Sequence, residues 1–477
     1  MPDTKLFLCG KWRDASDGRR FDVLNPATGE VIGTCAHAGR DDIEAALASA
    51  ERGFQVWRAT TVNVRYDLLR KAAALLRERL EATARTLTLE QGKPIGEARL
   101  EIALSADILD WCAEEVRRAY GRIIPSRFAG VSQQVLREPV GPVAAFTPWN
   151  FPVSQAARKL GPAIATGCSV IVKAAEDTPA APAALVAALV DAGLPEGVLS
   201  LLYGDPAEIS GALIPSPVIR KVSFTGSVAV GKQLAGLAGS YMKRTTMELG
   251  GHAPAIVFAD ADLDRAGELL VRAKYRNAGQ VCVSPTRFLV EESVYEGFVE
   301  RFAQAARAIR VGQGVDEATA MGPLVSRRRQ QAVEDLVADA QRTGAGVIAG
   351  GNRIGNQGNF FEPTVLDRVP LEARAMNEEP FGPVALFRPF RKVEDVLDEA
   401  NRLPYGLATY LFTRSASNVA ALSTGIDTGM LTINHLGLGQ AETPFGGVKD
   451  SGYGSEGGTE ILEPYLTTRF VTHMAQA

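Results

Sequence analysis

Short apolar runs alternate with helical segments along the middle of the chain, and this alternation restricts the fold more than any other feature. The apolar runs are residues 143–146, 168–172, 198–202 and 221–224. Helical segments begin between them, near Pro152, Thr178, Pro206 and Ser227. Such alternation predicts repeated β–α–β units on a parallel sheet that is buried on both faces.

A second alternating series follows Gly251, with strands expected near residues 255–258 and 287–290 and helices near 262–277 and 294–309. Residues 41–90 repeat Ala, Leu, Arg and Glu at three- and four-residue spacing, which predicts helices that cover a sheet. A chain of 477 residues is too long for one ordinary core. The expected fold class is therefore α/β, with two doubly wound domains built on open parallel sheets. Two further extended segments, 122–138 and 466–473, could pair with each other or with another subunit.

The charge balance argues against two classes of partner. Lys and Arg number 51 and Asp and Glu 55, so the net charge of −4 offers no basic field for nucleic acid or an anionic membrane. Charged residues follow the short apolar run near the N-terminus at once, and no apolar run reaches the roughly 18 to 20 residues that span a bilayer. We expect a cytoplasmic protein that acts on a small molecule.

One of the five scattered cysteines is a candidate nucleophile. None of the five belongs to a CxxC pair, so neither a disulfide framework nor a zinc site is predicted. Cys282 follows Ala278 and Gly279 closely, and these small residues would let a substrate approach the thiol. Because a lone cysteine is most often a core residue, a catalytic role requires companions elsewhere in the chain.

Two polar residues are candidates for those companions. Glu248 precedes paired glycines at the junction of the two alternating series. Its carboxylate could act there as a general base, or it could lie on the surface beside a glycine hinge. Asn150 directly follows an apolar strand, at the edge where ligands bind in open α/β sheets. Its amide could donate to an oxyanion, or its side chain could cap the next helix.

Two motifs fit a dinucleotide. Lys173 and Glu176 follow another strand and could bond the hydroxyls of an adenosine ribose, or could belong to a solvated charged loop. Gly226 and Ser227 form a turn into a helix whose free amides could hold pyrophosphate. This turn does not follow the GxGxxG pattern, so alone it is weak evidence.

The motifs occur in one order along the chain: PWNFP, KAAE, FTGS, ELGG, GQVC and NEEPFGP. In this order the chain resembles the aldehyde dehydrogenase superfamily, from NPATG at residues 25–29 to PFGGVKDSG at 444–452. It is most similar to the branch of succinate-semialdehyde and α-ketoglutaric-semialdehyde dehydrogenases. The resemblance implies a homodimer or homotetramer with a β-hairpin oligomerisation arm. The implied NAD(P)-binding domain consists of residues 1–121 and 141–250, and residues 435–462 return to pack on it. The implied catalytic domain is 251–434. The implied arm consists of 122–140 and 463–477.

The resemblance also implies the role of each site residue. Cys282 is expected to be the nucleophile, Glu248 the general base, and Asn150 an oxyanion donor together with the Cys282 amide. The residues expected to hold NAD, or NADP, are Thr147, Pro148, Trp149, Lys173, Glu176, Gly204, Gly226, Ser227, Gly250, Glu379 and Phe381. Thiolate attack, hydride transfer to the nicotinamide and hydrolysis of a thioester would follow, and no metal is required.

The substrate is inferred from a few positions. Phe151 is expected in the substrate pocket, and the guanidinium groups of Arg158 and Arg287 could clamp the distal carboxylate of a semialdehyde. Either arginine could instead form an ordinary ion pair. Gly439 stands where succinate-semialdehyde enzymes often carry serine, which gives 2,5-dioxopentanoate nearly equal weight with succinate semialdehyde. The alternatives are uncharged aldehydes, transfer of the acyl group to coenzyme A, and a nucleotide-binding family member without activity.

Overall fold

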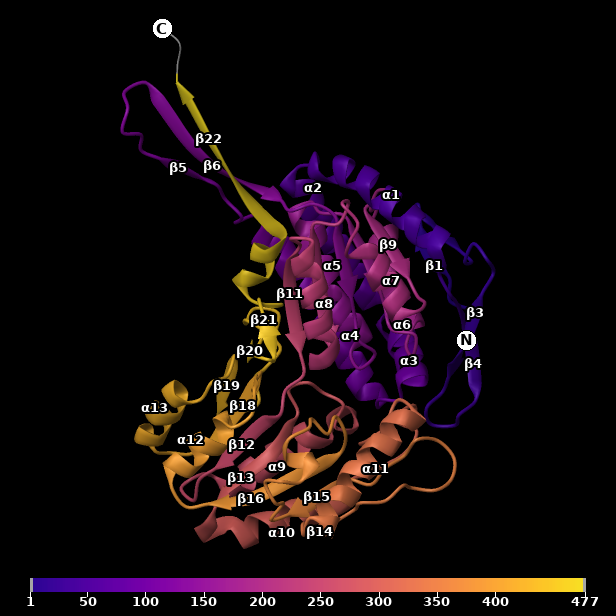
Figure 1. Ribbon diagram of the computed structural model, residues 1–477. Helices are drawn as coiled ribbons and strands as arrows, with labels where there is room; N and C mark the ends of the chain where they lie inside the picture. The colour runs from indigo at the N-terminus through magenta and orange to yellow at the C-terminus, as the bar shows by residue number, and fades with distance from the viewer. Residues whose placement is uncertain (1–2, 475–477) are drawn as a thin grey trace.

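The computed structural model describes residues 3–474, which form two α/β domains and a projecting β-hairpin arm (Figure 1). Residues 1–2 of the predicted first domain and 475–477 of the predicted arm lie outside the described residues. The chain passes from the first sheet to the second between Leu249 and Ala253. The α/β class with two sheets and an arm is confirmed.

The first sheet is parallel at its centre and antiparallel at its edges. Its strands, in spatial order, are β2 (Lys11–Arg13), β1 (Leu6–Leu8), β9 (Leu199–Leu202), β8 (Val170–Lys173), β7 (Val143–Phe146), β10 (Lys221–Gly226), β11 (Arg244–Leu249) and β21 (Gly452–Tyr453). The four predicted strands are confirmed as β7 to β10. The antiparallel edge strands, which come from distant parts of the chain, add to the parallel sheet that the sequence predicts.

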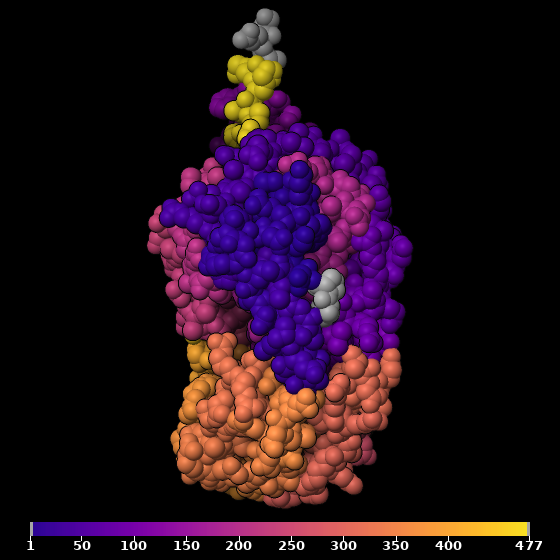
Figure 2. Space-filling view, turned by 90° about the vertical axis from the view of Figure 1, so that its right-hand side faces the viewer, coloured from indigo at the N-terminus to yellow at the C-terminus, as the bar shows by residue number. Residues whose placement is uncertain are grey.

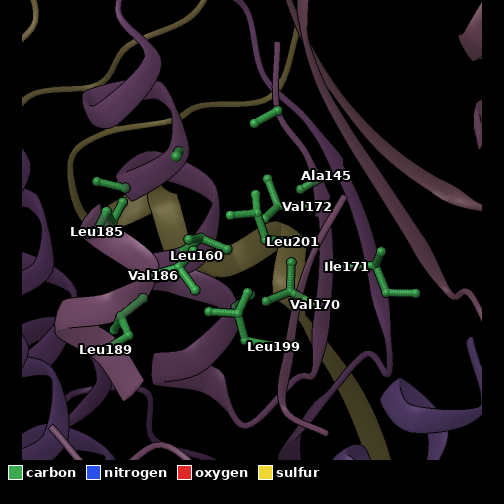
Figure 3. Packing of buried hydrophobic residues seen from close by; sticks show 14 of the residues in the cluster. Ala145, Leu160, Val170, Ile171, Val172, Leu185, Val186, Leu189, Leu199 and Leu201 are labelled. Atoms are coloured by element: carbon green, nitrogen blue, oxygen red, sulfur yellow. The ribbon is translucent and has the colours of Figure 1, made fainter. Parts of the chain in front are cut away.

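Helices cover both faces of this sheet. They are α1 (Arg40–Arg58), α2 (Val62–Glu78), α3 (Leu80–Gln91), α4 (Ile95–Val116), α5 (Pro152–Thr166), α6 (Ala180–Asp191), α7 (Pro206–Leu213) and α8 (Val228–Ser240). Side chains alternate between the two faces of a strand. Val170, Val172, Leu199 and Leu201 therefore point toward α5 and α6, whereas Ile171 lies on the other side of the sheet (Figure 3).

The second sheet is smaller and has its own core. Its strands, in spatial order, are β14 (Gly346–Ala349), β15 (Thr364–Asp367), β16 (Val384–Phe390), β13 (Pro285–Glu291), β12 (Ala253–Val257), β18 (Ala408–Phe412) and β19 (Met430–Ile433). Its helices are α9 (Leu263–Tyr275), α10 (Tyr295–Arg307), α11 (Arg327–Arg342), α12 (Val393–Asn401) and α13 (Ala416–Gly425). Of these, β12, β13, α9 and α10 were predicted from the sequence.

Two hairpins reach beyond the first sheet. The N-terminal hairpin of β3 (Arg20–Leu24) and β4 (Val31–Ala36) extends down to the second domain, where Asn359 N donates to Pro26 O at 2.9 Å (Figure 2). In the arm, β22 (Leu466–Met474) pairs antiparallel with β6 (Val131–Pro139), and β6 pairs with β5 (Arg122–Ile124). The expected pairing of the two extended segments with each other is confirmed.

The strand order of the first sheet reverses beside β7. From β7 the chain adds β8 and β9 on one side, and then returns to add β10 and β11 on the other. The loops that leave β7 and β10 consequently diverge at their carboxyl ends and open a crevice, where open α/β sheets bind ligands. Within residues 3–474, no helix is long and apolar enough to cross a membrane.

Candidate active site

Asn150 lies in the loop that leaves β7 and contacts the loop before Cys282. Its side chain is 4% exposed, and Nδ2 donates to the Gln280 carbonyl at 3.0 Å. The helix α5 has Phe151, not Asn150, at its N-cap, without a side-chain capping bond. The alternative that Asn150 caps this helix is therefore wrong, and the structure brings the amide to the candidate nucleophile.

A left-handed turn presents Cys282. Asn277, Ala278 and Gly279 have φ values of 48°, 52° and 71°, an arrangement that strains the two residues with a Cβ. A Cβ on Gly279 would lie 2.0 Å from the Gly382 carbonyl oxygen, so only glycine fits there. The thiol is partly exposed, whereas Cys35, Cys112 and Cys168 are buried in the core.

Glu248 ends β11 beside the nucleophile loop. The residue is 1% exposed, and neither carboxylate oxygen has a hydrogen-bond partner among the described residues. A Cβ on Gly251, three residues later, would lie 3.5 Å from the Cys282 carbonyl oxygen. The alternative of a surface carboxylate is wrong, because Glu248 is enclosed at the junction of the two domains.

The surroundings favour the protonated forms of both groups. Burial, and then the nearby Glu456, raise the pKa of Glu248 well above the usual carboxyl range. Burial, and then Glu248, raise the pKa of the Cys282 thiol well above its usual value. A buried acid without hydrogen-bond donors can accept a proton readily once ionised, which suits a general base.

Behind Glu248 lies a buried polar cluster that the sequence analysis missed. Lys159 of α5 pairs with Glu456, and its Nζ donates to the Thr225 hydroxyl at 2.7 Å. Ser223 Oγ donates to Glu456 at 3.2 Å. All fifteen residues of α5 are buried. Two adjacent charged residues, Arg158 and Lys159, inside such a helix are the sequence signal that could have indicated this cluster.

The adenosine end of a dinucleotide fits the crevice. Lys173, at the end of β8, forms an ion pair with Glu176. Ser227 is the N-cap of α8, and its hydroxyl makes no capping bond, which leaves it and the first amides of α8 for a phosphate. A Cβ on Gly204, whose φ is 146°, would lie 3.0 Å from the Ala38 carbonyl oxygen. Gly226 precedes Ser227 directly.

The nicotinamide end fits the space between the domains. Glu379 is buried against Gly250, where a Cβ would lie 2.3 Å from Glu379 Oε2, and its Oε1 accepts from Gly251 N at 3.4 Å. Burial raises the pKa of Glu379 to about 8. The Trp149 ring meets Phe381 edge-on at 5.5 Å, next to Thr147 and Pro148 in the β7 loop. The buried Thr147 hydroxyl has no partner among the described residues, so a bound group could engage it.

Arg158 is buried near the thiol. Its guanidinium lies 4.7 Å above the Phe445 ring, and two nitrogens donate to the carbonyls of Glu456 and, at 2.6 Å, Gly439. Both Glu248 and Cys282 act electrostatically on this group. Arg158 therefore lies near the thiol with both terminal nitrogens bonded to protein carbonyls, and its role in substrate binding stays a prediction.

The prediction that Arg287 binds substrate is wrong. Arg287 lies on β13 and is 1% exposed. Its Nε donates to the His252 carbonyl at 2.9 Å, and its Nη1 donates to Glu399 Oε1 at 3.0 Å and to the Glu399 carbonyl at 2.6 Å. Since Nη2 also donates to the Ala400 carbonyl at 3.2 Å, this arginine ties β13 to α12 and has no nitrogen left for a substrate.

A different arginine, which the sequence analysis missed, lies in the cavity next to Cys282. The cavity has a volume of about 1000 Å³ and lies between α9 and α10, and the neighbours of Cys282 that border it are Val281, Val283 and Ser284. The Arg276 guanidinium lies 5.0 Å from the Phe151 ring centre. Its side chain is exposed and makes no hydrogen bond or ion pair with residues 3–474. The available signal was its place six residues before the thiol.

Residues 12–471 match the model of the aldehyde dehydrogenase family. The chain belongs to this family. The aldehyde dehydrogenase is 50% identical over 471 residues to a putative 4-(hydroxymethyl)benzenesulfonate dehydrogenase from Comamonas testosteroni, a match covering 99% of this chain and 98% of the relative. It is 40% identical over 477 residues to the NADP-dependent succinate-semialdehyde dehydrogenase of Escherichia coli, with 99% of each chain covered.

Solved structures agree with this assignment. The crystal structure of succinate-semialdehyde dehydrogenase from Burkholderia pseudomallei matches with a TM-score of 0.97 and 40% identity, over 99% of this chain and 98% of that one. The protein is therefore an oxidoreductase of the aldehyde dehydrogenase type, and its cofactor is NAD or NADP.

Proposed function

We propose that this aldehyde dehydrogenase oxidises aldehydes that carry a strong anion far from the carbonyl. The observation that carries the proposal is Arg276, an exposed guanidinium in the cavity that Val281 and Val283 border. It acts electrostatically on Glu97 of the same cavity but makes no hydrogen bond or ion pair with the described residues. A free guanidinium can bind a carboxylate or a sulfonate through two parallel hydrogen bonds. The carboxylated candidates are succinate semialdehyde and 2,5-dioxopentanoate.

A sulfonated aromatic aldehyde is a second candidate. The cavity lining includes four apolar side chains close in sequence to the thiol or grouped near it, Val281, Val283, Leu436 and Leu438, which suit a ring as the spacer. The relative that is 50% identical is named for a benzenesulfonate. A Cβ at Gly439 would contact the Phe445 ring at 3.8 Å and the Arg158 guanidinium at 4.0 Å. The volume of about 1000 Å³ leaves room for spacers longer than that of succinate semialdehyde.

The proposed chemistry begins with a proton transfer between the Cys282 thiol and the Glu248 carboxylate. Glu248 takes the proton of the Cys282 thiol, and the thiolate attacks the aldehyde carbon to form a hemithioacetal. The Asn150 amide and the Cys282 backbone amide hold the alkoxide. NAD, when bound at the crevice, supplies the acceptor for the hydride that leaves the aldehyde carbon.

Hydrolysis of the resulting thioester needs a second proton transfer, for which Glu248 first releases the thiol proton to solvent. Glu248 has no hydrogen-bond partner among residues 3–474 that would compete for its oxygens, so it is free to orient and deprotonate a water. A base placed here favours water over coenzyme A as the acyl acceptor. Glu176, paired with Lys173, favours NAD because a carboxylate repels the 2′-phosphate of NADP.

Self-association is part of the same proposal. The arm exposes large apolar side chains, with Ile123 81%, Phe128 69% and Phe470 56% exposed. Exposed apolar groups on a projecting hairpin indicate a surface that another subunit covers. We expect a homodimer or homotetramer in light scattering, and a monomer of normal activity at assay concentration would contradict this.

The substrate proposal is tested by Arg276→Met. Loss of the guanidinium should lower kcat/KM for succinate semialdehyde, 2,5-dioxopentanoate and 4-sulfobenzaldehyde by about 10- to 100-fold, the worth of a charged hydrogen bond. Values for benzaldehyde and butanal should stay within about twofold, because these aldehydes lack the anion. Arg272→Met, which removes an exposed arginine from the same cavity wall, is the matched control. Equal losses for charged and uncharged aldehydes would contradict the proposal.

A further inference from the structure

A buried ion pair lies directly beneath the Asn150 loop. Lys93 Nζ lies 2.5 Å from Glu101 Oε2, and both side chains have 0% exposure. Lys93 Nζ also donates to the main-chain carbonyl of Asn150 at 2.7 Å and lies 3.9 Å from the Phe151 ring centre. The lysine thus contacts the loop that carries Asn150 and Phe151 without lining the cavity itself.

The same carbonyl joins the two domains. Asn277, the first left-handed residue of the nucleophile loop, donates from Nδ2 to the Asn150 carbonyl at 3.1 Å. Asn150 returns a bond from its own Nδ2 to the Gln280 carbonyl at 3.0 Å. Two bonds therefore set the position of Asn150 relative to the Cys282 loop, and one of them ends on the carbonyl oxygen that Lys93 and Asn277 share.

Helix capping alone does not explain the lysine. Glu101 Oε1 accepts from the first amides of α5, Val153 N at 2.9 Å and Ser154 N at 3.2 Å. Glu90 is a second buried carboxylate, and it caps α6 in the same way, accepting from Ala180 N and Ala181 N at 2.9 and 2.8 Å. Glu90 has no cationic partner among the described residues, so a carboxylate can cap a helix here without one. What Lys93 adds is the bond to Asn150.

We infer that Lys93 is a positioning residue, which, held by Glu101, fixes the Asn150 carbonyl so that the Asn150 amide stays within reach of the intermediate on Cys282. This inference rests on the catalytic roles proposed above for Asn150 and Cys282. It does not depend on the proposed anionic substrate. A displacement of about 1 Å at an oxyanion donor can cost about 100-fold in rate.

The test measures two reactions of Lys93→Met. The first is the NADH burst with saturating NAD and butanal. The second is hydrolysis of 4-nitrophenyl acetate without NAD, which needs the thiol, the oxyanion donors and Glu248 but no hydride transfer. Both rates should fall about 10- to 100-fold, whereas the Kd for NAD should stay within about twofold. If both rates are unchanged in Lys93→Met but fall in Asn150→Ala, the inference about Lys93 is overturned and the proposed role of Asn150 stands.

A double variant separates positioning from folding. In Lys93→Met/Glu101→Gln the unpaired buried charge is gone, so the melting temperature should recover relative to Lys93→Met while both rates stay low. The matched control Glu90→Gln should lower the melting temperature and retain both rates. Rates that recover in step with stability would overturn the inference. A normal burst in Asn150→Ala would overturn the proposed role of that residue, and the inference with it.

Discussion

Two buried carboxylates near the active site, Glu101 and Glu248, differ in their hydrogen bonding. Glu101 accepts hydrogen bonds from Lys93, Val153 and Ser154, so each of its oxygens has a partner. Glu248 is equally buried, yet neither of its oxygens has a partner within residues 3–474. A satisfied buried group rigidifies its surroundings, whereas an unsatisfied one retains a perturbed pKa that chemistry can use. This contrast agrees with the roles proposed here, in which the side with Glu101 holds the site in place and the side with Glu248 takes part in the chemistry.

The largest effect is expected from the reactive side. Cys282→Ala removes the nucleophile, so both NADH formation and ester hydrolysis should fall by at least about 1000-fold. Cys282 is partly exposed and its side chain is small, so the melting temperature should change by less than that of Lys93→Met, which leaves a buried charge unpaired. Circular dichroism provides the folding control. Turnover of the folded variant at the wild-type rate would remove the assignment of this cysteine.

The pH dependence sharpens the contrast between the two carboxylates. The pKa of Glu248 is raised, so the carboxyl is largely protonated at low pH and must ionise to act as a base. Single-turnover deacylation should therefore rise about tenfold per pH unit on the acid side, up to a pKa above the usual carboxyl range. In Glu101→Gln the rate should be lower but the apparent pKa should stay the same. A flat profile in the wild-type enzyme would contradict Glu248 as the base.

The smallest effect on catalysis is expected at Arg287. Removing one partner of a buried ion pair costs about 3 to 5 kcal/mol, so Arg287→Met should lower stability toward urea by about that amount. The ratio of kcat/KM for charged and uncharged aldehydes should stay unchanged, because Arg287 is fully engaged with α12. A lower kcat/KM for the charged aldehydes alone would support the original prediction that Arg287 binds the distal carboxylate.

The sequence was a reliable guide where a motif followed a strand. The central strands β7 to β10 and the residues at their carboxyl ends, such as Asn150, Lys173 and Ser227, lie where the alternating pattern predicts. This succeeded because a buried parallel strand must be a continuous apolar run, and its end must face the crevice. The edge strands were missed, since their partners come from segments far apart in the chain.

The sequence was a poor guide to which way a charged side chain points. Arg276 and Arg287 lie six residues before and five residues after Cys282, so spacing alone makes both candidates. A left-handed turn follows Arg276 and leaves its side chain in the cavity, whereas Arg287 is held on β13 by the Glu399 pair. Adjacent residues of a strand face opposite sides, and no motif specifies which side is the site. Lys93 and Glu101 were missed for a related reason, because their contacts with Asn150 and with the first amides of α5 depend on how α4 packs against α5.

The most direct test of the central claim traps the acyl intermediate on Cys282. Glu248→Gln keeps the shape of the site but removes its base. The thioester should form more slowly, through thiolate generated by solvent, and its hydrolysis should slow still more, so the thioester accumulates. The variant is mixed with NAD and excess aldehyde, quenched in acid, digested and analysed by mass spectrometry. We expect a burst of about one NADH per active site and a Cys282 peptide heavier by the aldehyde less two hydrogen atoms. Steady turnover at the wild-type rate without this adduct, or an adduct on another residue, would contradict the account.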